Sequence, residues 1–282
     1  ESGPEVDGSC PDKCLRVEAT LIAKLNLADF QNAVPMLREL RIVNDTALAA
    51  QDLELRIASE PGFLKPKTWR IDTVAAGDSC RIPDLDVQLD GALLTRLTEA
   101  EQAVVTLTLR QRGGDAPDLA RFERAVELLP RNQWGGLSHL PDLVAAFVQP
   151  NEPAVERLLK QAAEVLRKNG RSAALDGYKG GSKRAWELSS AIWSAVAAMG
   201  LDYALPPASF EHTGQKVRGP GQIAESGLAT CLDLALLFCA AIEQAGLNPL
   251  LVFTKGHAFA GVWLRAEEFS STVVDDVTAL RK

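Results

Sequence analysis

Residues 227–238, GLATCLDLALLF, contain the strongest structural signal in the sequence. Thr230 is a favoured N-cap residue, and Asp233 three positions later completes a variant of the capping-box pattern. The apolar run continues to Gln244, and Gly246 supplies a stop signal. The sequence therefore predicts a helix over residues 231–244 whose first residue is Cys231.

Two short strands are expected after this helix. Residues 250–254, LLVFT, have the composition of a buried strand, and Lys255-Gly256 turns the chain into residues 257–264, HAFAGVWL. The second strand opens with His257. A cysteine at a helix start and a strand-borne histidine are what thiol-dependent acyl transfer needs, because the helix terminus favours the thiolate and the imidazole carries the proton.

This part of the chain resembles the transglutaminase-like cysteine-protease superfamily, over roughly residues 185–264. The resemblance rests on the Cys-x-Asp-x-Ala helix start, the Ala-Gly-Leu-Asn-Pro helix end and the Gly-His-Ala strand. Residues 206–211 (PPASFE), 214–218 (GQKVR) and 230–237 (TCLDLALL) are similar to one subgroup, found in the N-terminal region of large bacterial helicase-like proteins. The resemblance implies an α+β domain with a papain-like helix and antiparallel sheet, and a helicase region elsewhere in the polypeptide.

The same resemblance implies the catalytic residues. Cys231 matches the family's nucleophile and His257 its general base. The family's third residue is an Asp on the strand after the histidine strand, and here Asp275 and Asp276 follow the strand-like residues 272–274. Their interval from His257 is longer than usual, which leaves open an acid beyond the end of this chain.

Other polar residues near the predicted helix have competing interpretations. Gln215 and Gln222 are both candidates for an oxyanion-hole amide, and spacing does not choose between them. Asp233 is expected to cap the helix rather than act as an acid, and Cys239 is expected in the core. Trp263 shares a strand face with His257 and fits either core packing or the wall of a cleft.

Three further sets of residues are assigned no chemistry. His212 is expected on the surface, and Lys216 and Arg218 are expected to form a small solvated basic cluster. Cys10 and Cys14 could supply half of a zinc site, but a structural zinc site needs four ligands. No P-loop spacing occurs, so no nucleotide or other cofactor is expected.

The N-terminal part has a different periodicity. Apolar and polar residues alternate in short runs separated by turn signals, which predicts strands with one buried face. These runs are residues 15–21, 37–43, 53–57, 69–72 and 104–109. The pattern resembles the immunoglobulin-like β-sandwiches that occur as accessory modules on bacterial proteins, a resemblance that implies no functional residue.

The predicted organisation has three parts. The β-sandwich is expected over residues 1–114, because residues 112–117 are rich in turn formers. Apolar spacings of three and four from Leu119 to Leu129, and in later segments, predict a helical linker region over 115–184. The transglutaminase-like domain is then expected over 185–282, truncated at its C-terminus.

Composition limits the possible functions. The 282 residues carry 30 basic and 37 acidic side chains, a formal charge of −7, which argues against direct nucleic-acid binding by this piece. No segment resembles a membrane span or a signal peptide, and five cysteines do not suggest a disulfide framework, so a cytoplasmic location is expected. The chain begins with Glu1 and is expected to be a fragment of a longer protein.

Two functions remain open at this stage. The first is hydrolysis of an amide in a protein or peptide by the Cys231 thiol, as a peptidase or amidase. The second is a catalytically inactive module of the same fold, which docks a partner or senses a ligand in a helicase-associated or defence protein.

Overall fold

The computed structural model describes residues 14–113 and 117–280. The chain is a mixed α+β protein with two compact units, which divide between Arg131 and Asn132. Each unit has its own hydrophobic core, and each is described separately below.

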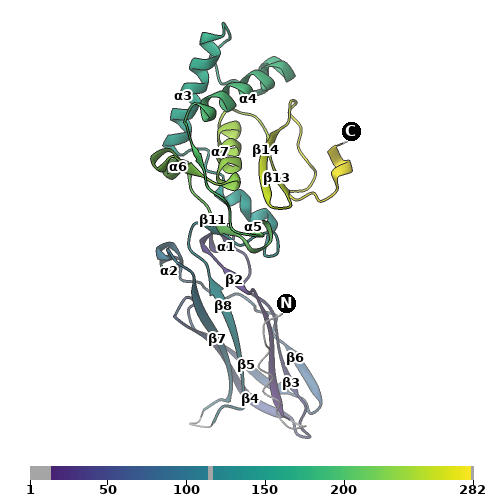
Figure 1. Ribbon diagram of the computed structural model, residues 1–282. Coiled ribbons are helices and arrows are strands. Elements are labelled where there is room, and N and C mark those ends of the chain that lie inside the picture. The colour runs from purple at the N-terminus through teal and green to yellow at the C-terminus, as the bar shows by residue number, and fades with distance from the viewer. Residues whose placement is uncertain (1–13, 114–116, 281–282) are drawn as a thin grey trace. The chain divides into compact units, whose positions relative to one another are not determined.

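The first unit is built from two sheets whose strands are mostly antiparallel (Figure 1). One has the order β1-β3-β6, and the other has the order β2-β8-β7-β4-β5. The strands are β1 (Leu15–Leu21), β2 (Lys24–Leu25), β3 (Leu37–Asn44), β4 (Ala50–Glu60), β5 (Lys67–Val74), β6 (Asp78–Arg81), β7 (Glu101–Gln111) and β8 (Ala120–Leu128). Two short helices, α1 (Leu27–Gln31) and α2 (Gly91–Arg96), lie in the connections.

Alternating burial explains why these residues form two packed sheets. In β4, Leu53, Leu55 and Ile57 are buried while the residues between them face outward. Leu55 pairs with Leu109 of β7, which is also buried, and the same alternation continues along that strand. Burying one face of each strand in a shared core is the driving force for this arrangement. The predicted sandwich of strands is therefore observed.

The predicted boundary at residue 114 is wrong. Residues 119–129 were expected to be helical, but 120–128 form β8, which pairs antiparallel with β7 from Glu101 to Leu109. Phe122, Val126 and Leu128 face inward at a period of two. Exposed Arg124 interrupts this alternation, so the apolar spacing alone matched a helix, and pairing with β7 overrode it.

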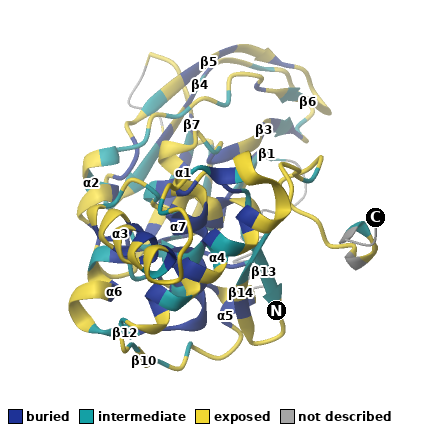
Figure 2. Cartoon of the chain, turned by 90° about the horizontal axis from the view of Figure 1, so that it is seen from above, coloured by how far each residue is buried: buried dark blue, intermediate teal, exposed yellow. Residues whose placement is uncertain are grey.

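The second unit contains three helices around one core: α3 (Pro153–Lys168), α4 (Gly181–Ala197) and α7 (Cys231–Gln244). Apolar faces of all three pack together, with α7 buried along most of its length (Figure 2). The expected linker region 115–184 therefore does not exist as such, since α3 belongs to the same core as α7. The helix expected over residues 231–244 is observed with the same bounds as α7.

Shorter elements complete this unit. The helical ones are η1 (Pro141–Phe147), η2 (Gly177–Gly180), α5 (Phe210–Thr213), α6 (Pro220–Ser226) and η3 (Val277–Leu280). The strands are β9 (Gln133–Trp134), β10 (Asp202–Tyr203), β11 (Gln215–Lys216), β12 (Leu228–Ala229), β13 (Pro249–Thr254) and β14 (His257–Val262). β13 and β14 form the expected hairpin, with Thr254 opposite His257.

α7 and β13 have nearly the same length, and β13 brings the chain back to the start of α7. The helix has 14 residues and is about 21 Å long, and β13 has 6 residues and is about 20 Å long. The Cys239 thiol in mid-helix lies 3.8 Å from the Leu250 carbonyl, so β13 runs back along α7. The turn before His257 is therefore at the end of α7 that carries Cys231 (Figure 1).

A third strand was expected at residues 272–274, before Asp275. Residues 263–276 instead have no helix or strand, and β13 and β14 form a two-stranded sheet among the described residues. Val273 and Val274 are exposed, so no burial supports a strand at this position.

Within the described residues, no helix combines the length and the apolar character required to cross a lipid bilayer.

Candidate functional site

The start of α7 has the predicted cap. The Asp233 amide donates to the Thr230 hydroxyl at 3.2 Å, and the Thr230 amide donates to the Asp233 carboxylate at 2.9 Å. Cys231 is the first helical residue and is 3% exposed. Its thiol thus lies at the positive end of the helix dipole, where a negative charge is stabilised.

Residues 214–218, called the clamp below, form hydrogen bonds with the start of this helix. The Gln215 side-chain amide donates to the Thr230 hydroxyl at 2.9 Å. The Arg218 backbone amide and guanidinium both donate to the buried Asp233 carboxylate, at 2.8 and 3.0 Å. Each pair is 15 residues apart, so the two sequence segments align along each other.

Three sequence interpretations concern residues at or near this clamp. Arg218 is not a freely solvated charge as expected, because it pairs with a carboxylate that has no exposed surface. Of the two glutamines considered for an oxyanion hole, Gln215 is buried beside the helix start, whereas Gln222 is exposed on α6. Asp233 is the helix cap, as predicted.

Tyr203 is the residue that contacts the Cys231 thiol. β10 pairs parallel with β12, which places Tyr203 opposite Ala229, two residues before the cysteine. The Tyr203 phenol lies close enough to Cys231 for the two groups to interact. Burial, followed by the neighbouring Cys231 thiol, raises the pKa of Tyr203 above its ordinary value of 10.0. Tyr203 is 53% exposed, whereas Cys231 is buried.

Sequence reasoning assigned no role to Tyr203. The available signal was its place at the end of the segment after α4, which the family resemblance also covered. The parallel pairing of β10 with β12 joins residues 26 positions apart and has no local sequence signature.

His257 opens β14 and is exposed. Its ring lies beside that of Phe259, with centroids 6.3 Å apart. Ala258 between them is buried, and Val262 packs against the core that contains α7. Since alternate residues face opposite sides of a strand, His257 is directed to the other face of the hairpin. Among the described residues, no hydrogen bond or ring contact joins His257 to Cys231.

The Glu211 carboxylate, three residues before the clamp, binds the turn that precedes His257. The Gly256 amide donates to the buried Glu211 carboxylate at 3.1 Å. Hydrogen bonds from the Glu211 amide and then the Gly256 amide hold the pKa of this carboxyl below its ordinary value of 4.5. Nearby, the Trp134 ring stacks on Phe253 of the hairpin at 5.0 Å.

Several buried polar atoms around this position lack a hydrogen-bond partner among the described residues: Trp134 Nε1, Glu211 Oε2 and Gln215 Oε1. Trp134 pairs with Gln215 between β9 and β11, and Gln215 bonds the residue before Cys231. Turning the Gln215 amide over would exchange its two ends but leave one unpaired. Unpaired buried polar groups are rare in folded proteins and mark positions where a ligand or water fits.

The acidic candidates lie elsewhere. Asp275 and Asp276 are exposed in the irregular segment after β14. The Thr278 amide and hydroxyl donate to Asp276 at 2.8 and 2.6 Å, and the hydroxyl bond is the main reason that the pKa of Asp276 is lowered. Among the described residues, no hydrogen bond or ion pair joins either carboxylate to His257. The structure thus gathers Cys231, Tyr203 and Gln215, and places His257 at the same helix end with its ring turned away.

The remaining candidates have structural positions. Cys239 is buried on α7, as predicted, and burial raises its pKa to about 12. His212 is exposed, as predicted. Trp263 packs edge-to-face on Phe269 at 5.2 Å, and its buried Nε1 has no partner among the described residues.

The pair of cysteines considered for zinc lies partly outside the described residues. Cys10, one of the two cysteines considered for zinc, lies outside the described residues. Within the described ranges, no three His, Cys, Asp or Glu side chains gather closely enough to hold a metal ion.

Comparison with known proteins gives little further information. No family model matches the sequence, and the curated proteins contain no match to it. Among solved structures, the chain is similar to the CARDB domain of a protein from Pyrococcus furiosus, solved in complex with di-metal ions. The identity is 11%, the match covers 45% of this chain and 100% of that one, and the TM-score is 0.26.

Proposed function

We propose that the second unit is a transglutaminase-like thiol hydrolase acting on an amide in a protein or peptide. The observation that carries the proposal is the position of Cys231 as the first residue of the capped helix α7, with His257 returned to the same helix end. An immunoglobulin-like character of the sandwich, and a helicase region in the longer polypeptide, belong to the same proposal.

In this proposal the Cys231 sulfur attacks the amide carbonyl carbon and forms a tetrahedral intermediate. His257 takes the thiol proton and gives it to the leaving nitrogen as the C–N bond breaks. Water then hydrolyses the thioester. The Cys231 amide and Gln215 are the donors available for the developing oxyanion. Asp275 or Asp276 would orient the imidazole.

Two movements are required before this chemistry. The Tyr203 phenol must move away from Cys231, because it lies beside the thiol that would attack the substrate. The His257 ring must turn from Phe259 toward the helix end. Both side chains are exposed at the surface, so neither rotation opens the core.

The test is the pH dependence of iodoacetamide labelling at Cys231 in the full chain, followed by mass spectrometry, with Cys239 as an internal control. An ionised thiol labels fastest, and the raised pKa of Cys239 keeps that residue slow. We expect Cys231 in the Tyr203→Phe variant to label at least tenfold faster than Cys239 at pH 6.5, and His257→Ala to shift the profile. Equal labelling of both cysteines, unaffected by His257→Ala, would contradict the enzyme.

A second function is favoured by two observations. Cys231 is buried beside Tyr203, and no carboxylate contacts His257 among the described residues. These features suit a catalytically inactive interaction or sensing module. A slow thiol in both the unmodified chain and the Tyr203→Phe variant would favour this alternative.

A further inference from the structure

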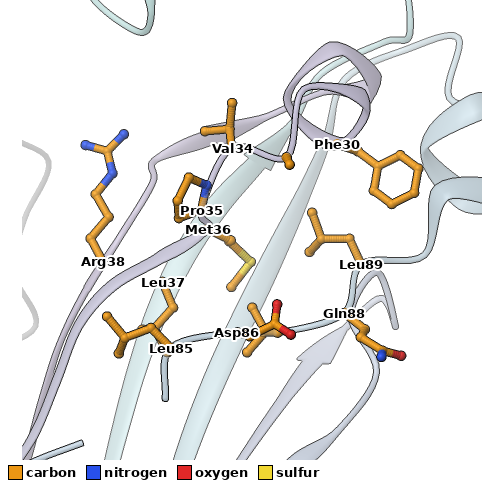
Figure 3. A pocket seen from close by; sticks show the side chains of 12 residues that line it. Phe30, Val34, Pro35, Met36, Leu37, Arg38, Leu85, Asp86, Gln88 and Leu89 are labelled. Atoms are coloured by element: carbon orange, nitrogen blue, oxygen red, sulfur yellow. The ribbon is translucent and has the colours of Figure 1, made fainter. Parts of the chain in front are cut away.

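The first unit contains a groove beside β3, at a distance in sequence from every residue proposed above for catalysis. Its volume is about 790 Å³, and it lies between residues 33–38 and residues 85–89 (Figure 3). The side chains in it are mainly apolar: Val34, Met36 and Leu37 on one side, and Leu85, Val87 and Leu89 on the other. We call it the β3 groove.

The groove forms where the chain after β6 separates from β3. β6 pairs with residues 41–44 of β3, and one further bond joins the Ile82 amide to the Leu40 carbonyl. The chain then crosses to the edge of the other sheet, where the Trp69 indole donates to Asp84 and the Lys65 amide donates to Gln88. The half of β3 before Leu40 therefore has no strand on its outer side among the described residues.

The departing segment presents an unpaired backbone edge to the groove. The carbonyls of Asp84, Asp86 and Gln88 all accept bonds from the β5 side. Residues between them point their N–H and C=O groups the opposite way, because these groups alternate along an extended chain. Within the described residues, no hydrogen bond reaches the backbone groups of Leu85, Val87 and Leu89.

The β3 side of the groove is irregular. β3 pairs with β1 through a register shift at Arg38, since Glu39 lies opposite Thr20 and Leu37 lies opposite Leu21. Such a β-bulge interrupts the alternation of backbone groups, so the open strand edge of the groove is the one formed by Leu85, Val87 and Leu89.

Charges of opposite sign stand on the two sides. Arg38 belongs to the β3 side and Asp86 to the other, and neither side chain has an ion-pair partner among the described residues. A partner segment with an acidic residue facing Arg38 and a basic residue facing Asp86 would complement both charges.

We propose that the β3 groove binds an extended peptide segment of a partner protein, which adds as a strand with alternating apolar side chains. The unpaired groups of Leu85, Val87 and Leu89 would bond its backbone, and its apolar side chains would pack against the partly exposed Val34, Leu85 and Val87. Strand addition of this kind takes affinity from the main chain and specificity from alternate side chains. The groove volume is in the range of ordinary ligand clefts.

The test uses the full chain and a synthetic peptide, Glu-Val-Thr-Val-Thr-Val-Thr-Val-Lys, in calorimetric titration. Two control peptides are the same composition with its valines contiguous, and the same sequence methylated at every second backbone nitrogen. We expect binding of the alternating peptide only, together with slower amide exchange at Leu85, Val87 and Leu89. Absence of binding, or equal binding of the methylated peptide, would overturn the proposal.

Variants locate the binding. Val87→Asp places a charge in the groove and should weaken binding at least tenfold, whereas Val104→Asp, at an exposed valine of β7 that does not line the groove, should leave it unchanged. Val87→Pro removes an amide that has no partner in the free chain and should also weaken binding. Equal binding to all three variants would refute this location, and a dimer of the free chain that Val87→Asp dissociates would assign the groove to a second copy instead.

Discussion

The two units differ in how completely their buried polar side chains are hydrogen-bonded. In the sandwich, Asn44 is fully buried and donates to the carbonyls of Leu48 and Val74, while its oxygen accepts from Thr46. In the second unit, the buried side chains of Glu211 and Gln215 each leave one oxygen unpaired. All buried side-chain nitrogen and oxygen atoms that lack a partner among the described residues belong to the second unit.

This difference separates polar groups that specify a fold from polar groups available for chemistry. A fully paired group such as Asn44 fixes the loop between two strands and has no bond left for another molecule. The half-paired groups beside the start of α7 retain bonding capacity in a place where water is excluded. The contrast predicts different costs when the two kinds of group are removed.

The largest effect is expected at Asp233, a buried side chain of the second unit that is fully paired. Asp233→Ala removes the helix cap and leaves Arg218 without its buried partner, and should lower the unfolding free energy of this unit by about 3 kcal/mol. Urea-dependent hydrogen exchange, read by mass spectrometry, resolves the two units. Asp45→Ala, which breaks an exposed pair with Arg16, is the matched control and should cost less than about 1 kcal/mol. An equal loss in both variants would show that the Asp233 network is not structural.

The next effect compares one residue from each kind directly. Asn44→Leu removes the bonds to the Leu48 and Val74 carbonyls, the second of which is buried, and should destabilise the sandwich by about 2 kcal/mol. Gln215→Leu removes one bond but also one unpaired oxygen, and should change the stability of the second unit by less than about 1 kcal/mol. The same exchange measurement checks both. A larger loss from Gln215→Leu than from Asn44→Leu would reverse the comparison.

The smallest effect is a pH dependence. Because hydrogen bonds lower the pKa of Glu211 in the folded chain, its contribution to stability is present above its ordinary value of 4.5 and is lost as the pH falls below it. The stability of the second unit should therefore decline between pH 5 and pH 3, and Glu211→Gln should flatten that decline. Calorimetric unfolding across this range tests it, with Glu225→Gln, an exposed residue on α6, as the control.

Much of the fold could be predicted because the signals are local. The cap at Thr230 and the stop at Gly246 gave the bounds of α7, and strict alternation gave β1 over residues 15–21. Residues 119–129 were mistaken for a helix, because a strand at this position depends on β7 as a neighbour. The strand expected at 272–274 had apolar residues but nothing to pair with among the described residues.

The site was less predictable than the fold. The position of Cys231 followed from the capping pattern, whereas the contact with Tyr203 depends on pairing between β10 and β12. Likewise, the sequence suggests a solvated Arg218, because its partner Asp233 lies 15 residues later and is adjacent to it only in the folded chain. The roles of Cys231, His257, Asp275 and Asp276 remain predictions that the labelling experiment addresses.

The contact between Tyr203 and Cys231 has an optical consequence. The chain has two tyrosines, and the other one, Tyr178, bonds the Trp263 carbonyl and the Asn248 amide, away from any thiol. A negative charge formed on Cys231 would perturb the near-ultraviolet absorption of the Tyr203 phenol. Difference spectra of the Tyr178→Phe variant would therefore record the charge of that sulfur without any added reagent, so that the residue beside the thiol also reports on it.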